Sequence, residues 1–148
     1  MNLFKKKPKP ILLKENIYIE HQELTHQQAI DKVGKILKDS GYVTQKYIDG
    51  MHRRDQELSV YLGNMLAIPH GVFEVKDEII ASGMCVLVVP NGIDWHGEVV
   101  KVVIGLAGKG EEHMKILSNI SMVFAEIEEV EKLVSEQNPQ KIFELFNQ

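Results

Sequence analysis

His70 is the side chain of this sequence best suited to act as a nucleophile. It follows Ile68-Pro69 at the end of a short β-prone run, and proline, which lacks an N–H, cannot continue a sheet ladder. Gly71 on its other side leaves space for a bulky group or another protein's backbone. A histidine of ordinary pKa is largely neutral at pH 7 and keeps one ring nitrogen free for attack. The alternative, which spacing alone favours, is a strand-end histidine in an ordinary turn.

A second candidate segment, residues 108–113, is a glycine-rich turn that leads into a helical pattern. Helix N-termini attract anions, which would suit a phosphoryl group, although two adjacent glutamates already complement the helix dipole. His113 precedes Leu117 by four residues and therefore leans toward the apolar face of this helix. The alternative for His113 is a half-buried histidine at a helix start.

Two adjacent arginines, Arg53 and Arg54, close a predicted helix that begins near Thr44. One of them could clamp a phosphate, because the guanidinium presents forked donors that match phosphate oxygens. The alternative is a pair of solvated surface side chains.

The remaining histidines form no recognisable metal motif, because no pair has the HExxH or CxxC spacing of a zinc site. His96 follows Trp95 in a connection between two predicted strands, and we expect this tryptophan to fold onto the sheet. His21, His26 and His52 are interpreted as surface residues. We expect no metal and no cofactor, and the sequence contains no GxxxxGK[ST] nucleotide loop.

The pattern of predicted elements indicates an α/β fold in which a mixed β-sheet is flanked by helices. Thr25 and Gln28 form a capping box before the first helix, which ends at Ser40-Gly41. Pro90-Asn91-Gly92 is a strong turn signal and is predicted to end the fourth strand. The strands are predicted at residues 17–19, 60–62, 66–68, 84–89 and 99–107, and the helices at about residues 26–39, 44–55, 114–124, 127–134 and 139–146.

The composition indicates a single globular domain in a reducing, cytoplasmic setting. The chain has 148 residues, 44% hydrophobic residues, one cysteine and a formal net charge of −4. Residues 1–10 are predicted to be a basic, flexible tail, and residues 11–148 one domain. Without this tail the chain is still more acidic, which argues against nucleic-acid binding. Cys85 lies within an apolar run and is interpreted as a core residue.

The run from Gly63 to Gly71 resembles the active-site signature of the enzyme IIA component of the sugar phosphotransferase system, fructose/mannitol type. Residues 41–43, 47–51 and 105–113 follow in that family's order and look like its mannitol branch. The resemblance extends over nearly the whole chain from about Ile17. It implies a mixed sheet flanked by helices, and a phosphocarrier that is a phosphotransferase component.

The resemblance also implies residue roles and partners. His70 would accept a phosphoryl group from phospho-HPr, with Arg54 and His113 beside it. His70 would then pass the group to a cysteine of enzyme IIB. We expect enzyme IIB and the membrane component IIC on separate chains, and mannitol or a similar sugar as the transported substrate. The transient docking interface would have an apolar rim formed by Met65, Leu66, Val72 and Phe73.

The sequence departs from the family pattern at Asn64, where some mannitol members carry an acidic residue, and at Val72, where many have threonine. Three alternatives to a transport phosphocarrier stay open. The first is a regulatory enzyme IIA-like switch read out by its phosphorylation state. The second is a metal-dependent hydrolase that uses His70, His96 and His113. The third is a module that binds through its basic tail.

Overall fold

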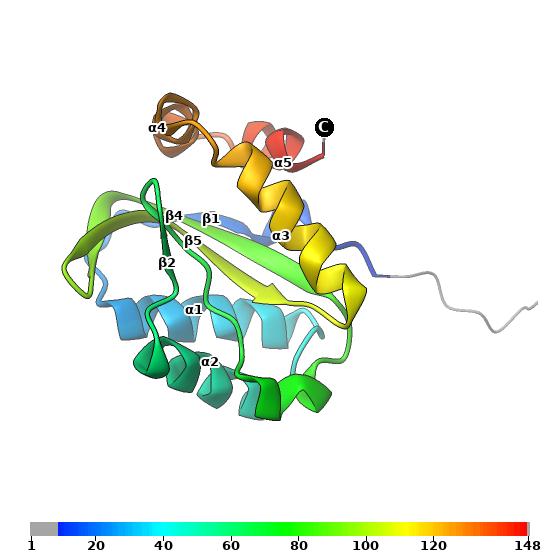
Figure 1. Cartoon of the computed structure of the whole chain (residues 1–148). Coiled ribbons are helices and arrows are strands. Elements are labelled where there is room, and N and C mark those ends of the chain that lie inside the picture. Colours follow the sequence, from blue (N-terminus) through cyan, green and yellow to red (C-terminus); the bar gives the residue numbers. More distant parts are fainter. Residues whose placement is uncertain (1–8, 148) are drawn as a thin grey trace, which may run out of the picture.

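A mixed five-stranded β-sheet forms the centre of the computed structural model, which describes residues 9–147 (Figure 1). The strand order is β1-β4-β5-β3-β2. β1 pairs in parallel with β4, and β3 in parallel with β5, whereas the β4–β5 and β2–β3 pairs are antiparallel. The strands are β1 (Ile17–Ile19), β2 (Tyr61–Gly63), β3 (Leu66–Ala67), β4 (Gly83–Trp95) and β5 (Glu98–Ala107).

Helices cover both faces of this sheet, which confirms the predicted architecture (Figure 1). The predicted capping box is present, because the Gln28 N–H donates to Thr25 Oγ1 (3.1 Å) and the Thr25 N–H donates to Gln28 Oε1 (2.9 Å). One face carries α1 (His26–Asp39) and α2 (Gln45–Glu57), and the other α3 (Glu111–Val123), α4 (Ile127–Ser135) and α5 (Pro139–Phe146). Two 3₁₀ turns, η1 (Lys14–Asn16) and η2 (Phe73–Glu78), complete the described elements.

The apolar run of β4 supplies both cores, because successive side chains of a strand point to opposite faces. Cys85, Leu87 and Val89 pack into the cluster beneath α1 and α2. Their neighbours at positions 84, 86 and 88 pack into the cluster beneath α3, α4 and α5. The Cys85 thiol is fully buried and lies 3.4 Å from the Val33 carbonyl oxygen. Burial raises the pKa of this thiol to about 12, as suits the core residue predicted from the sequence.

The predicted break at Pro90-Asn91-Gly92 is wrong, because β4 continues through these residues as far as Trp95. The pairing with β5 shifts register there, since Val88 pairs with Val102 but Ile93 pairs with Val100. A bulge of this kind accommodates a proline that has no N–H to give to the ladder. The hairpin turn lies instead at His96-Gly97, where both residues have positive φ (52° and 93°), as a two-residue type I′ turn requires.

The predicted basic tail, residues 1–10, lies mostly outside the described residues. Its two described members contact the domain: Lys9 Nζ donates to the Ser40 carbonyl and lies 4.5 Å from the centre of the Tyr42 ring. The Tyr42 hydroxyl in turn donates to the Pro10 carbonyl. The boundary at residue 11 therefore stays a prediction. Within residues 9–147, no helix is both long enough and apolar enough to cross a bilayer.

Candidate phosphoryl-transfer site

The two histidines singled out in the sequence lie at one edge of the sheet. β3 and β5 are parallel neighbours, so their carboxyl ends meet at the same edge, where α/β sheets commonly bind ligands. His70 follows the end of β3, and the turn that leads to His113 follows the end of β5. The Leu106 N–H donates to the Pro69 carbonyl (2.9 Å), which holds the two exits together. The sheet therefore brings together two segments that are distant in sequence.

One hydrogen bond fixes the protonation pattern of the His70 ring. His70 Nδ1 lies 2.8 Å from the Ile68 carbonyl oxygen. Because a carbonyl oxygen can only accept, Nδ1 carries the proton and Nε2 keeps its lone pair. Burial, followed by the nearby charges of Arg54 and His113, lowers the pKa of His70 below its usual 6.5, although the bond to Ile68 opposes this shift. The ring is thus neutral at pH 7 and offers Nε2 as its nucleophilic atom.

His113 faces His70 from the first turn of α3. The two ring centroids are 5.9 Å apart and the ring planes are tilted by 55°. This approach requires glycine at position 108, because a Cβ there would lie 2.6 Å from the Cα and Cβ atoms of His113 and 2.7 Å from its Nδ1. Burial lowers the pKa of His113, so this ring is also neutral at pH 7. A neutral imidazole can donate one hydrogen bond to an anionic group in front of it.

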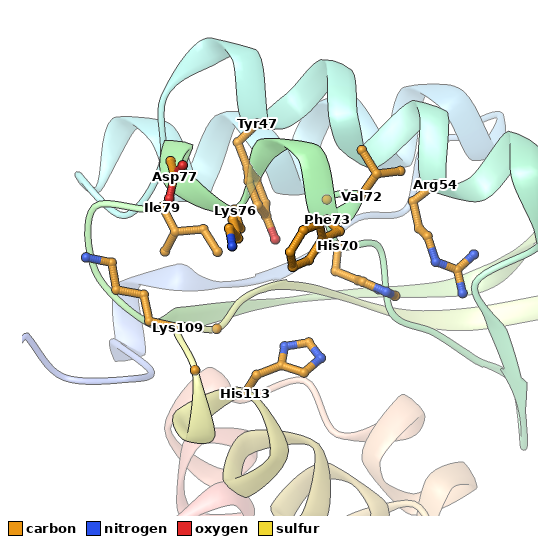
Figure 2. Close-up of a pocket in the computed structure, with 13 residues that line it drawn as sticks. Tyr47, Arg54, His70, Val72, Phe73, Lys76, Asp77, Ile79, Lys109 and His113 are labelled. Atoms are coloured by element: carbon orange, nitrogen blue, oxygen red, sulfur yellow. The ribbon is translucent and has the colours of Figure 1, made fainter.

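An open cavity of about 800 Å³ lies in front of both rings (Figure 2). Its charged lining is mainly positive, with Arg54, Lys76 and Lys109 against the single carboxylate of Asp77. Figure 2 shows His70 and His113 entering the cavity from opposite sides. Such a cavity attracts a dianionic phosphoryl group. Its lining residues are Tyr47, Arg54, His70, Gly71, Val72, Phe73, Lys76, Asp77, Ile79, Gly108, Lys109, Gly110 and His113.

The structure separates the two adjacent arginines. Arg53 is exposed and engaged elsewhere, with its Nε 3.0 Å from Glu57 and its NH2 group 3.6 Å from Glu74. Arg54 lines the cavity and donates to the Leu58 carbonyl (2.5 Å) at the end of α2. Only Arg54 is therefore placed to meet a group bound at His70.

Gly71 has a different reason to be glycine from the one expected. The space beside it is filled by this chain's own side chains, because a Cβ there would lie 2.6 Å from the Tyr47 ring and 2.7 Å from Val75. The Tyr47 hydroxyl donates to the Leu106 carbonyl (2.7 Å) from within the protein. Tyr47 thus supports the cavity wall. The sequence places it only within the segment 47–51 and predicts no role for it at the site.

The expected apolar rim is partly wrong. Val72 and Phe73 line the cavity, and the Phe73 side chain is 74% exposed. Leu66, however, is buried within β3, and Met65 packs against the core beneath α3, α4 and α5. Met65 belongs to the turn before β3 and Leu66 to the strand itself, both on the side of α3, α4 and α5, and neither lines the cavity.

Asn64 has a structural contact that the sequence did not show. Its Nδ2 donates to the Phe124 carbonyl (2.8 Å) at the end of α3. Its φ is +49°, a left-handed conformation that asparagine tolerates better than most residues. The residue therefore ties the β2–β3 turn to α3 and does not line the cavity.

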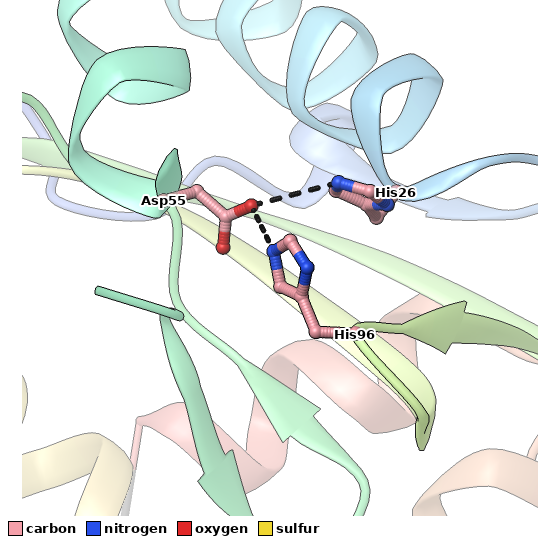
Figure 3. A group of neighbouring side chains, drawn as sticks. All are labelled: His26, Asp55 and His96. Atoms are coloured by element: carbon pink, nitrogen blue, oxygen red, sulfur yellow. Dashed lines mark hydrogen bonds and ion pairs between the residues drawn. The ribbon is translucent and has the colours of Figure 1, made fainter. Parts of the chain in front are cut away.

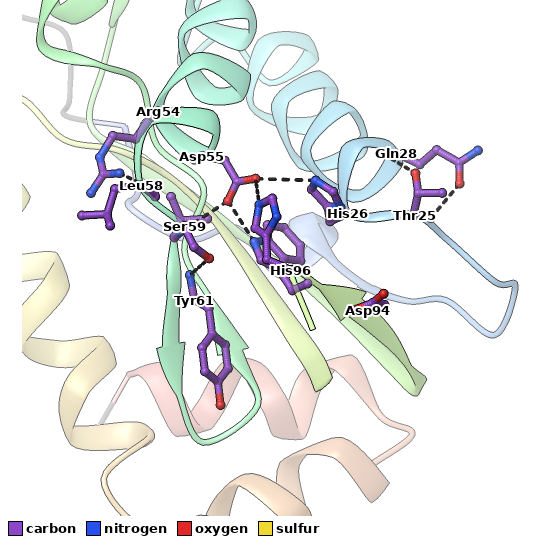
Figure 4. A network of polar contacts seen from close by, with 12 residues as sticks. Thr25, His26, Gln28, Arg54, Asp55, Leu58, Ser59, Tyr61, Asp94 and His96 are labelled. Carbon is purple, nitrogen blue, oxygen red and sulfur yellow. Dashed lines mark hydrogen bonds and ion pairs between the residues drawn. The ribbon is translucent and has the colours of Figure 1, made fainter. Parts of the chain in front are cut away.

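His96 does not line the cavity that His70 and His113 share, so the structure does not assemble the three-histidine hydrolase site. Its Nε2 instead lies 2.8 Å from Asp55 Oδ2 (Figure 4). Trp95 is fully buried, which confirms that it folds onto the sheet. His26 is at the surface but half-buried, because its side chain is 19% exposed and lies next to Asp55, a contact that the sequence did not show. The cause is the length of β4, which brings the His96 turn over the start of α1.

Comparison with known proteins agrees with a site for phosphoryl transfer. Residues 10–148 match the family model described as "Phosphoenolpyruvate-dependent sugar phosphotransferase system, EIIA 2". A mannitol-specific phosphotransferase enzyme IIA component of Staphylococcus aureus is 45% identical over 134 residues, which are 90% of this chain and 93% of that protein. The corresponding component of Halalkalibacterium halodurans is 46% identical over 132 residues, covering 89% and 91%.

A solved structure also resembles the chain over most of its length. It is the complex of enzyme IIA and phosphorylated enzyme IIB of the Escherichia coli mannitol system, with a TM-score of 0.83 and 28% identity over 90% of this chain and 94% of that one. The fold and cavity define a phosphotransferase component with a mixed α/β fold. The chain belongs to the EIIA 2 family of the phosphoenolpyruvate-dependent sugar phosphotransferase system.

Proposed function

We propose that this protein is a cytoplasmic phosphocarrier in which His70 takes a phosphoryl group from phospho-HPr and passes it to enzyme IIB. The observation that carries the proposal is the Nδ1 contact of His70 with Ile68, which leaves Nε2 as the nucleophilic atom of the ring. The positively charged cavity and the family membership agree with it. We place this carrier domain at residues 11–148.

The first transfer forms one bond and breaks one. The lone pair of His70 Nε2 attacks the phosphorus of the HPr phosphohistidine, and the P–N bond of the donor breaks as its electron pair returns to the donor imidazole. His70 keeps its Nδ1 proton, so the phosphorylated ring carries positive charge next to the Ile68 carbonyl. This hydrogen bond stabilises the charged ring. No nucleotide, metal or external base is required in this step.

The other cavity residues act on charge and position. In the transition state of phosphoryl transfer, negative charge is spread over the oxygens of the transferred group. Catalysis therefore consists mainly of positioning and electrostatic stabilisation. Arg54 is proposed to donate to these oxygens from the end of α2, and His113 from the start of α3. Lys109 precedes α3, so its charge adds to the positive end of that helix. In this proposal His70 alone among the cavity residues forms a covalent bond with the phosphoryl group.

The second transfer needs an acceptor from another protein. Cys85 is the single cysteine of the sequence, and its buried thiol with a pKa of about 12 cannot serve as that acceptor. We propose a cysteine of a separate enzyme IIB chain, which would hand the group to the sugar carried by the membrane component IIC. The names of the relatives support mannitol as that sugar.

Both partners must reach the same nitrogen, so the docking surface surrounds the cavity. Phe73 is the most exposed apolar side chain of the lining and stands next to the buried Val72. We propose that Phe73 contacts each partner in turn. Partners that exchange in this way use interfaces that bury less than about 1,200 Å² in total.

The test is phosphoenolpyruvate-dependent phosphorylation with purified Enzyme I and HPr, read by intact mass. We expect one phosphoryl adduct that is lost in acid and absent from His70→Ala. His21→Ala is the matched control, because His21 is an exposed histidine outside the cavity, and it is expected to be phosphorylated like the wild type.

The adduct is then mixed with enzyme IIB of a mannitol system and, separately, of a fructose system. Faster discharge to the mannitol protein supports the transport role and its sugar. An adduct that forms but discharges to neither would favour the regulatory alternative. Absence of any adduct, with Enzyme I and HPr active on another acceptor, would overturn the proposal.

A further inference from the structure

A second cluster of ionisable side chains lies outside the phosphoryl-transfer cavity. His26 comes from the first turn of α1, Asp55 from the last turns of α2, and His96 from the β4–β5 turn (Figure 3). Asp55 Oδ2 lies 2.8 Å from His96 Nε2 and 3.7 Å from His26 Nε2. One nitrogen or oxygen from each residue lies within 4.8 Å of those of the other two. Three separate elements therefore converge on one point.

Asp55 is held in a fixed orientation. Its side chain is 3% exposed, and its Oδ1 accepts from Trp95 Nε1 (2.9 Å) and from the Val60 N–H (3.1 Å). These two donors leave Oδ2 to face the histidines. A buried carboxylate is costly unless a positive charge or further donors compensate it. Hydrogen bonds that orient a carboxylate from behind are typical of metal-binding carboxylates.

The two histidines are held by the ends of regular elements. Thr25 caps α1 immediately before His26, and the His26 ring packs 5.6 Å from Trp95 and 4.4 Å from His96, measured between centroids. His96 has a φ of +52° within its two-residue turn, and the Asp94 carboxylate accepts from the Gly97 N–H (2.8 Å) to brace that turn. The His96 side chain is 42% exposed, so the cluster opens to solvent on that side.

Hydrogen bonds do not account for the position of all three side chains, because His26 makes none with Asp55. Oδ2 is within hydrogen-bond distance of His96 only, because 3.7 Å to His26 is too long. A cation bound between the three atoms would use the His26 lone pair and neutralise Asp55 together.

We propose that His26, Asp55 and His96 bind a divalent transition-metal ion, and that Zn²⁺ is the ion that fits best. Two imidazoles and one carboxylate are a donor set typical of zinc, which binds them at about 2.0–2.2 Å in tetrahedral geometry. Tetrahedral ligand atoms at such bond lengths lie about 3.3 Å apart, and the observed 2.8 and 3.7 Å fall on either side of this value. Small ring rotations close the site, and water supplies the fourth ligand from the open side.

Trp95 provides the readout, because it is the single tryptophan of the chain, donates to Asp55 and packs against His26. The untagged full-length protein, freed of metal with EDTA, is titrated with ZnSO₄ while tryptophan emission and the melting temperature are followed. We expect a saturable change in emission at one ion per chain, and a higher melting temperature because the ion binds only the folded state. His26→Gln and His96→Gln should each weaken binding about tenfold or more.

Two controls separate this site from others. His21→Gln removes an exposed histidine outside the cluster and should bind Zn²⁺ like the wild type. His70→Ala should also bind like the wild type, because the ion is not expected at the His70–His113 pair. Circular dichroism checks that each variant is folded. Absence of saturable binding up to about a hundredfold excess of Zn²⁺, unchanged affinity in both cluster variants, or loss of binding in His70→Ala would overturn the proposal.

Discussion

The Nδ1 atom of His70 lies 2.8 Å from the carbonyl oxygen of Ile68, two residues earlier in the chain. This contact forms within the short segment from Ile68 to His70, so the tautomer of the ring is set by the local fold. The same contact leaves Nε2 as the atom without a proton. The nucleophile is therefore prepared before any partner protein arrives.

The first prediction concerns the titration of His70. Burial lowers its pKa below 6.5, so the neutral nucleophilic form persists as the pH falls through 6.5 and is lost only at lower pH. Nitrogen-15 NMR of the imidazole should show a titration midpoint below 6.5 and, above it, the tautomer with the proton on Nδ1. The spectrum of His70→Gln identifies the signals. A midpoint at or above 6.5, or a proton on Nε2, would contradict the geometry.

The second prediction compares the two adjacent arginines. Arg54→Gln should lower the rate of phosphoryl transfer from phospho-HPr by about 10²-fold, as expected for loss of a donor to the transferring group. Arg53→Gln is the matched control and should change the rate less than about threefold, because Arg53 pairs with Glu57 and Glu74 at the surface. Rapid-quench measurements of the phosphorylated fraction give both rates.

Arg54→Lys adds a second comparison for the same site. Lysine keeps the charge but not the forked donors of arginine, so we expect only partial recovery of the rate. Equal rates for Arg54→Gln and Arg53→Gln would show that Arg54 does not contact the transferred group.

The third prediction tests the packing of Gly108 against His113. A methyl group at position 108 would lie 2.6 Å from two atoms of His113, so Gly108→Ala must displace the first turn of α3. We expect slower phosphoryl transfer and a loss of about 1–3 kcal/mol in the free energy of unfolding, as for other overpacked sites.

A double-mutant cycle identifies the cause of the slower transfer. If Gly108→Ala acts through His113, it should slow transfer little further in the His113→Ala background. Additive losses of rate in the double variant would instead mean that the α3 turn contributes independently of His113.

The fourth prediction concerns the link between the β2–β3 turn and α3. Asn64→Asp replaces an amide that donates to the Phe124 carbonyl with an oxygen that can only accept. The free energy of unfolding should fall by about 1 kcal/mol, the usual effect of one hydrogen bond. Asn64→Gly, which keeps the left-handed backbone but loses the bond, is the control in urea denaturation. A more stable Asn64→Asp protein would contradict this role.

Much of the fold could be predicted because local signals and global packing agree. The Thr25–Gln28 capping box begins α1 where expected, and the unbroken apolar run of β4 correctly indicated a strand covered on both faces. The incorrect prediction of a turn at positions 90–92 shows what local sequence signals cannot distinguish. A proline-asparagine-glycine sequence looks the same in a turn and in a bulge, and only the pairing with β5 distinguishes them.

The positions of His70, Arg54 and His113 could be predicted from the sequence, but several other residues of the cavity wall could not. His70 and the turn before His113 carry recognisable sequence signals, because proline and glycine mark where the chain leaves the sheet. Tyr47 carries no such signal, since a tyrosine on a helix face is equally compatible with any core. His26 and His96 could not be paired either. Their proximity depends on how far β4 extends, and that length was hidden by the bulge.

The single cysteine of the sequence can report local opening of the fold, because its thiol reacts only when it becomes accessible to solvent. The Cys85 side chain lies on the face of β4 that α1 covers, and its sulfur contacts the Val33 carbonyl of that helix, so a reagent that alkylates thiols cannot reach it while α1 stays packed on the sheet. The labelling rate of the unmodified protein should therefore report how often α1 leaves the sheet. The same reagent applied to the phosphorylated and unphosphorylated forms would measure whether loading His70 tightens or loosens the scaffold, without an engineered probe.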